Sequence, residues 1–167
     1  GDPLDRVVFV DKAWGDWWGT ELLLTREWFE NHRITLGTEY RNNFREDQDE
    51  FDDTDVYLVS RESSSVAALF VQDEFRFSEQ LIFNLGIRHD DYSTVGGTTN
   101  PRAAVIWNPL QQTTFKLLYG TAFRAPNPYE LYYHDGDLTQ KVSQGLVPET
   151  IETYELILEQ QLDSSLR

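Results

Sequence analysis

Cysteine and methionine are both missing from the 167 residues of this chain. Without cysteine, a disulfide framework and any thiolate-ligated metal site are excluded. The chain starts Gly-Asp-Pro rather than with methionine, which indicates a segment of a longer protein. It also shows no positively charged start followed by an apolar run, the pattern of a signal peptide. We therefore expect residues 1–167 to be a fragment of one domain.

Long apolar runs and basic residues are also scarce. The longest apolar run, Val66 to Val71, is far below the roughly 18 residues of a membrane helix, which excludes a helical membrane protein. There are 14 basic against 29 acidic side chains, giving a net charge of −15. No basic stripe exists to contact phosphates, so nucleic acid is not expected as a partner. Aromatic residues make up 14% of the chain, which argues against disorder.

The strongest pattern in the sequence is the alternation of apolar and polar residues with a period of two. In residues 80–89, Leu81, Phe83, Leu85 and Ile87 fall on one face, and a mostly polar set falls on the other. The same alternation recurs along the chain and predicts eight strands, at Arg6–Asp11, Trp17–Phe29, Arg33–Phe44, Ser65–Phe77, Leu81–Tyr92, Pro101–Trp107, Thr113–Phe123 and Thr150–Gln161.

The connections alternate in length. We expect tight turns at 30–33, 78–80 and 108–112, and long loops at 45–64, 93–100 and 124–149. Short turns on one side and long loops on the other are typical of an outer-membrane β-barrel, whose strands alternate rather than become uniformly apolar. Two aromatic girdles fit the same fold: Trp28, Phe29, Phe75, Phe77, Phe83, Trp107 and Phe115 near the tight turns, and Trp17, Trp18, Tyr40, Phe44, Tyr92, Tyr119 and Phe123 near the long loops.

Six short motifs carry a family resemblance. They are Val71-Gln-Asp-Glu-Phe75, Leu85-Gly-Ile-Arg88, Asn100-Pro-Arg102, Gly120-Thr-Ala-Phe-Arg-Ala-Pro126 with Glu130-Leu131, Leu146-Val-Pro-Glu149 and Tyr154-Glu155. In this order and spacing the chain resembles the TonB-dependent outer-membrane receptors over most of residues 17–162. It departs from the family at Ile157, where glycine is usual.

The resemblance implies an all-β fold: an antiparallel up-and-down transmembrane β-barrel, of which this chain would supply about eight of about 22 strands. It implies TonB-energised uptake of a scarce nutrient such as a ferric siderophore, haem or cobalamin across the outer membrane of a Gram-negative bacterium. Outer-membrane lipid, a metal chelate and TonB would be the partners. No plug domain, the part that meets TonB, is found in residues 1–167, so the segment alone would not transport.

Two sets of residues are candidate sites. The start of the longest loop could hold an anionic or aromatic chelate by stacking and charge-assisted hydrogen bonds, through Arg124, Asn127, Tyr129, Tyr132, Tyr133 and His134. The alternative is that Arg124 and Pro126 only turn the strand into the loop. The acidic run could bind Ca²⁺, which favours oxygen ligands, through Asp47, Asp49, Asp52, Asp53 and Asp55. It lacks EF-hand spacing, and a solvated, self-repelling loop is the alternative.

Catalysis has little support. The three histidines are scattered, and no G-x-S-x-G or H-E-x-x-H motif occurs, so we expect no enzyme. Two other classes remain open. A porin-like barrel without TonB dependence would share the strand pattern, whereas a soluble all-β binding module would explain the acidity and the tryptophans.

Overall fold

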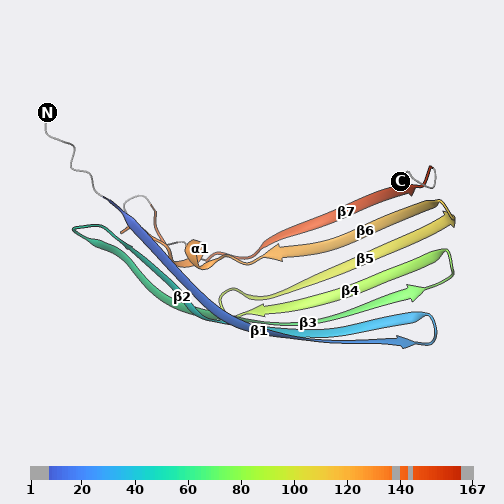
Figure 1. Cartoon of the computed structure of the whole chain (residues 1–167), viewed down its shortest axis with the longest axis horizontal. Helices are drawn as coiled ribbons and strands as arrows, with labels where there is room; N and C mark the ends of the chain where they lie inside the picture. Colours follow the sequence, from blue (N-terminus) through green and yellow to red (C-terminus); the bar gives the residue numbers. More distant parts are fainter. Residues whose placement is uncertain (1–7, 137–139, 143–144, 163–167) are drawn as a thin grey trace.

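The computed structural model describes residues 8–136, 140–142 and 145–162. Alternating segments pair with their sequence neighbours into one antiparallel sheet in the order β1-β2-β3-β4-β5-β6-β7, an up-and-down arrangement (Figure 1). The strands are β1 (Val10–Trp28), β2 (His32–Phe51), β3 (Val56–Arg76), β4 (Leu81–Tyr92), β5 (Gly96–Leu110), β6 (Thr113–Arg124) and β7 (Glu149–Gln160). The sheet is curved and open, with β1 and β7 at its edges.

The tight turns join β1 to β2, β3 to β4 and β5 to β6, all at one end of the sheet, as expected. The described residues form seven strands rather than the eight predicted, because residues 10 and 11 of the first predicted strand join the second predicted strand in β1, and residues 8 and 9 are not in a strand. Arg6 and Val7, the start of the first predicted strand, lie outside the described residues. Two of the three predicted long loops are also wrong. Residues 45–51 and 56–64 are paired strand, and β5 already starts at Gly96, so only residues 125–148 form a long connection.

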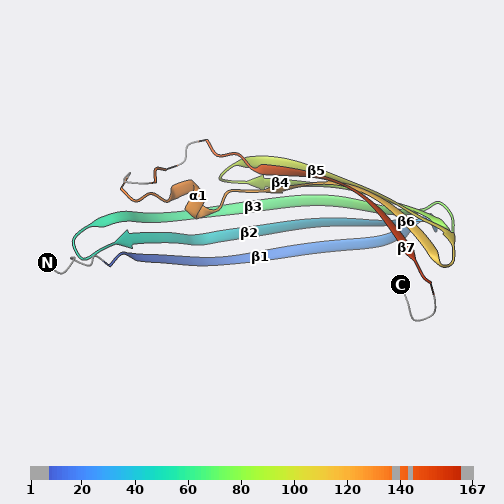
Figure 2. The same cartoon turned by 90° about the horizontal axis from the view of Figure 1, so that it is seen from above.

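The strands β1, β2 and β3 extend well beyond the others at the end opposite the tight turns (Figure 2). We call this part, residues 10–16 and 45–62, the extension. Part of the acidic charge that made it look like a loop is paired with Arg45 and Arg61 between and along its strands, and the hydrogen-bonded ladder continues through it.

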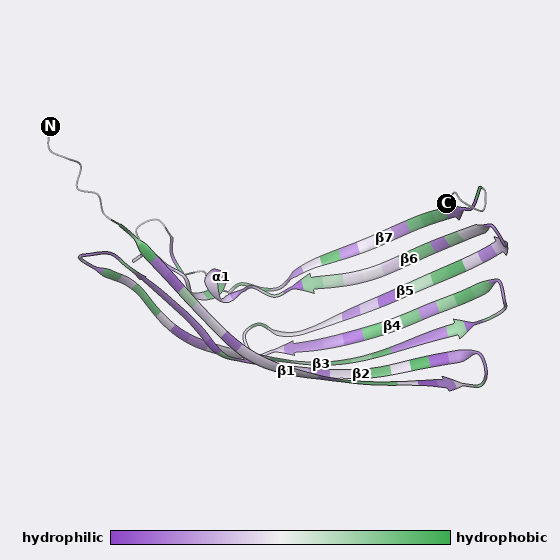
Figure 3. Cartoon of the chain, viewed as in Figure 1, coloured by the Kyte–Doolittle hydropathy of each residue, from purple (hydrophilic) through white to green (hydrophobic). Residues whose placement is uncertain are grey.

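One face of the sheet is apolar and open to its surroundings. On β4, Leu85 and Ile87 keep 58% and 47% of their surface exposed. Strand register puts the following exposed side chains on the same face: Leu22, Leu24, Leu36, Leu69, Leu117, Leu156 and Leu158. Among the described residues, only Leu58 and Ala68 are buried hydrophobic side chains. Hydrophobic and hydrophilic residues alternate along the strands (Figure 3), so the apolar surface covers one face of a wall and does not form an internal core.

The opposite face is polar and connected by ion pairs. Arg88 on β4 contacts Asp90 at 2.7 Å and reaches across β3 to Glu39 on β2 at 2.8 Å. Its guanidinium lies 5.4 Å from the ring centre of Phe70, and that ring covers Gly37 so closely that a Cβ there would overlap it. Asp90 is only 2% exposed, so its buried carboxylate relies on Arg88 for a compensating positive charge.

The girdle near the tight turns forms a set of ring contacts. Phe75, Phe77 and Phe83 lie within 6.5 Å of one another, and Trp107 stacks on Phe115 at 5.6 Å. The second girdle is only partly correct, since Trp17 lies on the polar face, where Arg41 stacks on it at 4.6 Å. None of the helices in the described residues is long and apolar enough to cross a membrane.

Candidate functional site

The connection from β6 to β7 begins with a short helix, α1 (Pro128–Tyr132), that sequence analysis missed. Asn127 caps it: its side chain accepts from the backbone N–H of Glu130, and the Glu130 carboxylate accepts from the backbone N–H of Asn127, both at 2.9 Å. Pro128 fits the first turn, where no N–H is needed. The sequence signal was therefore present in Asn-Pro-Tyr-Glu. α1 lies over the polar face, beside the extension (Figures 1 and 2).

Arg124 fastens both ends of this connection. Its guanidinium makes bidentate contacts with Glu130 of α1, at 2.8 and 3.0 Å, and with Glu149 at the start of β7, at 2.9 and 3.2 Å. The two carboxylates raise the pKa of Arg124, and Arg124 lowers the pKa of both carboxyl groups. This geometry supports the architectural interpretation of Arg124, since most of its donors are already used.

Replacing Arg124 with alanine should therefore loosen the connection without unfolding the sheet. We expect trypsin to cleave after the exposed Lys141 several-fold faster in Arg124→Ala than in the unmodified protein, because local opening exposes the backbone. Arg124→Lys, which keeps the charge but loses the fork geometry, should be intermediate. Equal cleavage rates in all three proteins would contradict this role.

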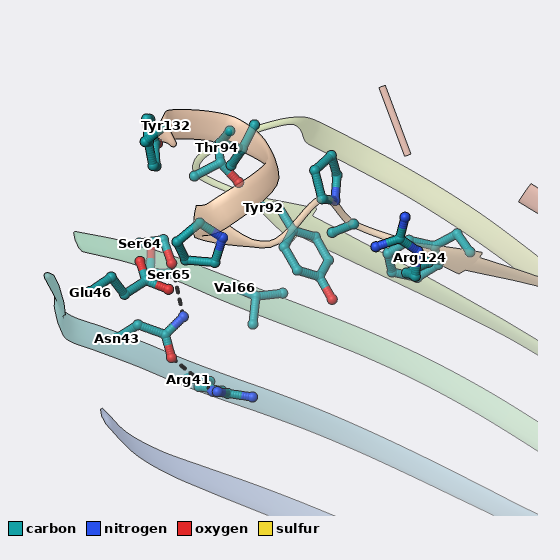
Figure 4. A pocket seen from close by; sticks show the side chains of 15 residues that line it. Arg41, Asn43, Glu46, Ser64, Ser65, Val66, Tyr92, Thr94, Arg124 and Tyr132 are labelled. Carbon is teal, nitrogen blue, oxygen red and sulfur yellow. Dashed lines mark hydrogen bonds between the residues drawn. The ribbon is translucent and has the colours of Figure 1, made fainter. Parts of the chain in front are cut away.

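Beneath α1 lies an open cavity of about 390 Å³. Figure 4 shows its floor of β2 and β3 residues, where Asn43 bonds both Arg41 and Ser64, and Tyr132 on the α1 side. Its lining combines hydroxyl groups, Arg41 and Glu46 with the apolar Pro126 and Leu131. Of the lining cations, Arg41 makes no ion pair within the described residues, whereas Arg124 is doubly paired.

The six predicted chelate-binding residues are not all brought to one point, although Arg124 and Tyr129 together line a further cavity of about 210 Å³. Tyr132 and Arg124 line the 390 Å³ cavity. Tyr129 and Tyr133 stack on each other at 4.3 Å and line a second cavity on the other side of α1. Asn127 caps the helix, and His134 accepts from the backbone N–H of Gly136 at 3.3 Å. Chelate binding by these residues stays a prediction, and the cavity lining also includes Arg41, Glu46 and Tyr92, which are not among the six.

The predicted calcium ligands lie in a strand and a turn, not in an open loop. Asp47 accepts from Arg45 at 2.7 Å, and Asp49 forms a bidentate pair with Arg61. Arg61 lowers the pKa of Asp49 mainly by its hydrogen bond. These two carboxylates are thus already paired with arginines of the extension, in exposed ion pairs that water screens.

The other three predicted ligands belong to the turn between β2 and β3. Asp52 accepts from the backbone N–H groups of Thr54 and Asp55, both at 2.7 Å, and from the Tyr57 hydroxyl at 2.6 Å. Asp53 is exposed. Among the described residues, no three His, Asp or Glu side chains gather so that they could hold a metal ion. The arrangement therefore offers no support for the calcium hypothesis.

The Asp52 turn should respond to pH. The hydrogen bond from Tyr57, followed by those from the backbone, lowers the pKa of Asp52, so the turn gains stability above the ordinary aspartate pKa and loses it as the pH falls below that value. The same bond raises the pKa of Tyr57 to about 12. In Asp52→Ala, NMR titration of labelled tyrosine should show the Tyr57 pKa lowered toward the ordinary tyrosine value of about 10, with burial and the charges of Asp55 and Glu50 still raising it slightly. Asp53→Ala should leave it raised, and an unchanged Tyr57 pKa in Asp52→Ala would refute the bond.

An open curved sheet with one apolar exposed face and one polar face defines the wall of a transmembrane β-barrel. The sequence profile described as "TonB dependent receptor-like, beta-barrel" matches residues 3–166. The chain belongs to this family. That membership rules out the soluble module and the barrel unrelated to TonB-dependent receptors as descriptions of the fold. A search of curated proteins found no match.

Solved structures agree on the fold. The siderophore receptor PirA from Pseudomonas aeruginosa is 23% identical, with a TM-score of 0.70 over 92% of this chain and 29% of that one. PirA from Acinetobacter baumannii is 20% identical, with a TM-score of 0.67 over 88% and 24%. A variant of the ferric enterobactin receptor PfeA from P. aeruginosa, in complex with enterobactin, is 19% identical, with a TM-score of 0.65 over 94% and 25%. The chain thus spans less than a third of these receptors.

Proposed function

We propose that this chain is part of the barrel wall of an outer-membrane receptor that takes up a ferric siderophore with energy supplied through TonB. Haem and cobalamin are the other nutrient classes that the family resemblance suggests. The observation that carries the proposal is the division of the sheet into an exposed apolar face and an ion-paired polar face, within a chain that belongs to this receptor family. The siderophore receptors among its structural neighbours support the choice of ligand class.

In this proposal the tight turns face the periplasm and the extension with α1 faces the outside of the cell. The apolar face contacts outer-membrane lipid. The polar face lines the lumen, where Arg88, Arg102 and Lys116 meet a plug domain supplied by the rest of the protein. The wall is a static conduit, and ligand capture falls to the outer loops and the plug.

The test is uptake by the full-length receptor. A Gram-negative host without its own siderophore receptors should gain radioactive iron from a ferric siderophore when the receptor is expressed, and should lose the gain when TonB is deleted. A panel of catecholate, hydroxamate and haem sources would identify the class. Membrane insertion without TonB-dependent uptake of any of these sources would overturn the proposed function while leaving the barrel fold intact.

A further inference from the structure

The second cavity beside α1 has about 250 Å³ and differs from the first in its walls. Its lining includes Asp11 of β1, Gln48 of β2 and Leu58 of β3 on the sheet side, and the stacked Tyr129 and Tyr133 on the other. Glu50 is not itself a lining residue, but in the sheet register it lies between the lining residues Asp11 and Leu58 and two residues from Gln48, so it shares their face.

Two polar side chains here are buried without complete pairing. Gln48 is 8% exposed and Glu50 is 6% exposed, yet Gln48 Nε2 and Glu50 Oε2 have no hydrogen-bond partner in the described part of the chain. Burial, followed by the neighbouring Glu50 carboxylate, raises the pKa of the Tyr133 hydroxyl. A buried carboxylate oxygen and a buried amide donor that stay unpaired cost free energy, and nearly all such groups in native proteins find a partner.

The surrounding charge favours a cation. The extension holds ten acidic and three basic residues. Arg45 and Arg61 pair with Asp16, Asp47 and Asp49, and Lys12, a lining residue, places its ammonium 5.1 Å from the ring centre of Phe51. None of these cations forms an ion pair with Asp11 or Glu50 within the described residues. Faces of tyrosine rings also attract ammonium groups.

We propose that this cavity binds a primary ammonium group that carries an oxygen acceptor a few atoms away. Glu50 Oε2 accepts from the ammonium, Asp11 adds negative charge, and Gln48 Nε2 donates to the oxygen. The biological role of the site rests on the proposed function: it would select metal chelates that bear a free amine near a hydroxyl or amide oxygen. This class differs from the anionic chelate expected from the residues around Arg124.

The test uses two small probes on the full-length receptor in detergent, with binding followed by saturation-transfer NMR. The probes are 3-amino-1-propanol, protonated at neutral pH, and its neutral counterpart 1,3-propanediol. We expect the amine to bind at least about tenfold more tightly, the size of a charge-assisted hydrogen bond. Glu50→Gln, which keeps an acceptor for Tyr133, should remove the difference. Asp53→Asn, an exposed carboxylate of the same extension, should preserve it.

Equal affinity of the two probes for the unmodified receptor would overturn the inference without relying on any variant. A preference for the amine that persists in Glu50→Gln would also overturn the inference, because the negative charge that binds the ammonium would then not belong to Glu50. Neither result depends on iron uptake. Loss of TonB-dependent uptake with the probe difference intact would instead count against the proposed function alone.

Discussion

Replacing Leu85 with arginine should cost the folded barrel about 2–4 kcal/mol and prevent much of it from assembling in the membrane. Leu85 is 58% exposed in the middle of β4, on the apolar face. In lipid, a guanidinium at that depth must leave water or distort the bilayer. Urea unfolding of the receptor in lipid vesicles gives the free energy, and the fraction that resists unfolding by detergent on a gel at low temperature gives the assembly yield.

A substitution of the adjacent residue is the matched control. Asn84 lies on the polar face, so Asn84→Arg introduces the same side chain one position away and should be tolerated within about 1 kcal/mol. If Leu85→Arg were tolerated as well as Asn84→Arg, the apolar face would be in water and the membrane account would fail.

Removing Arg88 should have the next largest effect. Arg88→Ala leaves the carboxylate of Asp90, which is 2% exposed, without its cation and also frees Glu39. Leaving a buried carboxylate without its partner costs about 1–3 kcal/mol, since the remaining charge stays desolvated, and the 36% exposure of Arg88 lets water screen part of the pair. The loss should appear in the same urea unfolding experiment.

Two variants separate burial from simple loss of charge. Arg76 pairs with Glu74 but is 59% exposed, so Arg76→Ala should cost less than about 1 kcal/mol. The double variant Arg88→Ala/Asp90→Ala should recover part of the stability lost in Arg88→Ala. Equal effects of Arg88→Ala and Arg76→Ala would show that the polar face is fully hydrated around Asp90.

The strands whose two faces differ clearly were predictable. The predicted span Leu81–Tyr92 coincides with β4, because apolar and polar residues alternate along its length and a tight turn at residues 78–80 precedes it. The tight turns and the antiparallel order followed from the same pattern. Family membership came from short motifs in a fixed order, a signal that is independent of hydrophobic periodicity.

The extension was not predictable from apolar alternation, because polar contacts stabilise it. Arg61 pairs with Asp49 across the hairpin, and Asp52 closes its turn. In the sequence alone these residues are indistinguishable from a solvated acidic run. Tyr133, which lies much later in the chain, also shares a cavity with Gln48 and Leu58 of the extension. Long-range pairing of this kind is invisible in the local sequence.

The candidate site was only partly predictable. Arg124 and the tyrosines were found as a group, but their division between two cavities depends on how α1 sits against the sheet. Gln48 and Glu50 look like members of a solvated acidic segment, and only the packing of the Tyr129–Tyr133 pair shows that they are buried.

The most direct test of the central claim, that the sheet is a barrel wall with its apolar face in lipid, uses the lack of cysteine in residues 1–167, with any cysteine elsewhere in the full-length receptor replaced by serine. Single cysteines introduced along β4, from Ile82→Cys to Ile87→Cys, would be spin-labelled in the full-length receptor in lipid vesicles. Collision rates with oxygen, which concentrates in lipid, should peak at positions 83, 85 and 87. Collision rates with a water-soluble nickel chelate should peak at positions 82, 84 and 86, which lie on the polar face. Water accessibility at 83, 85 and 87 equal to that of their neighbours would contradict the account.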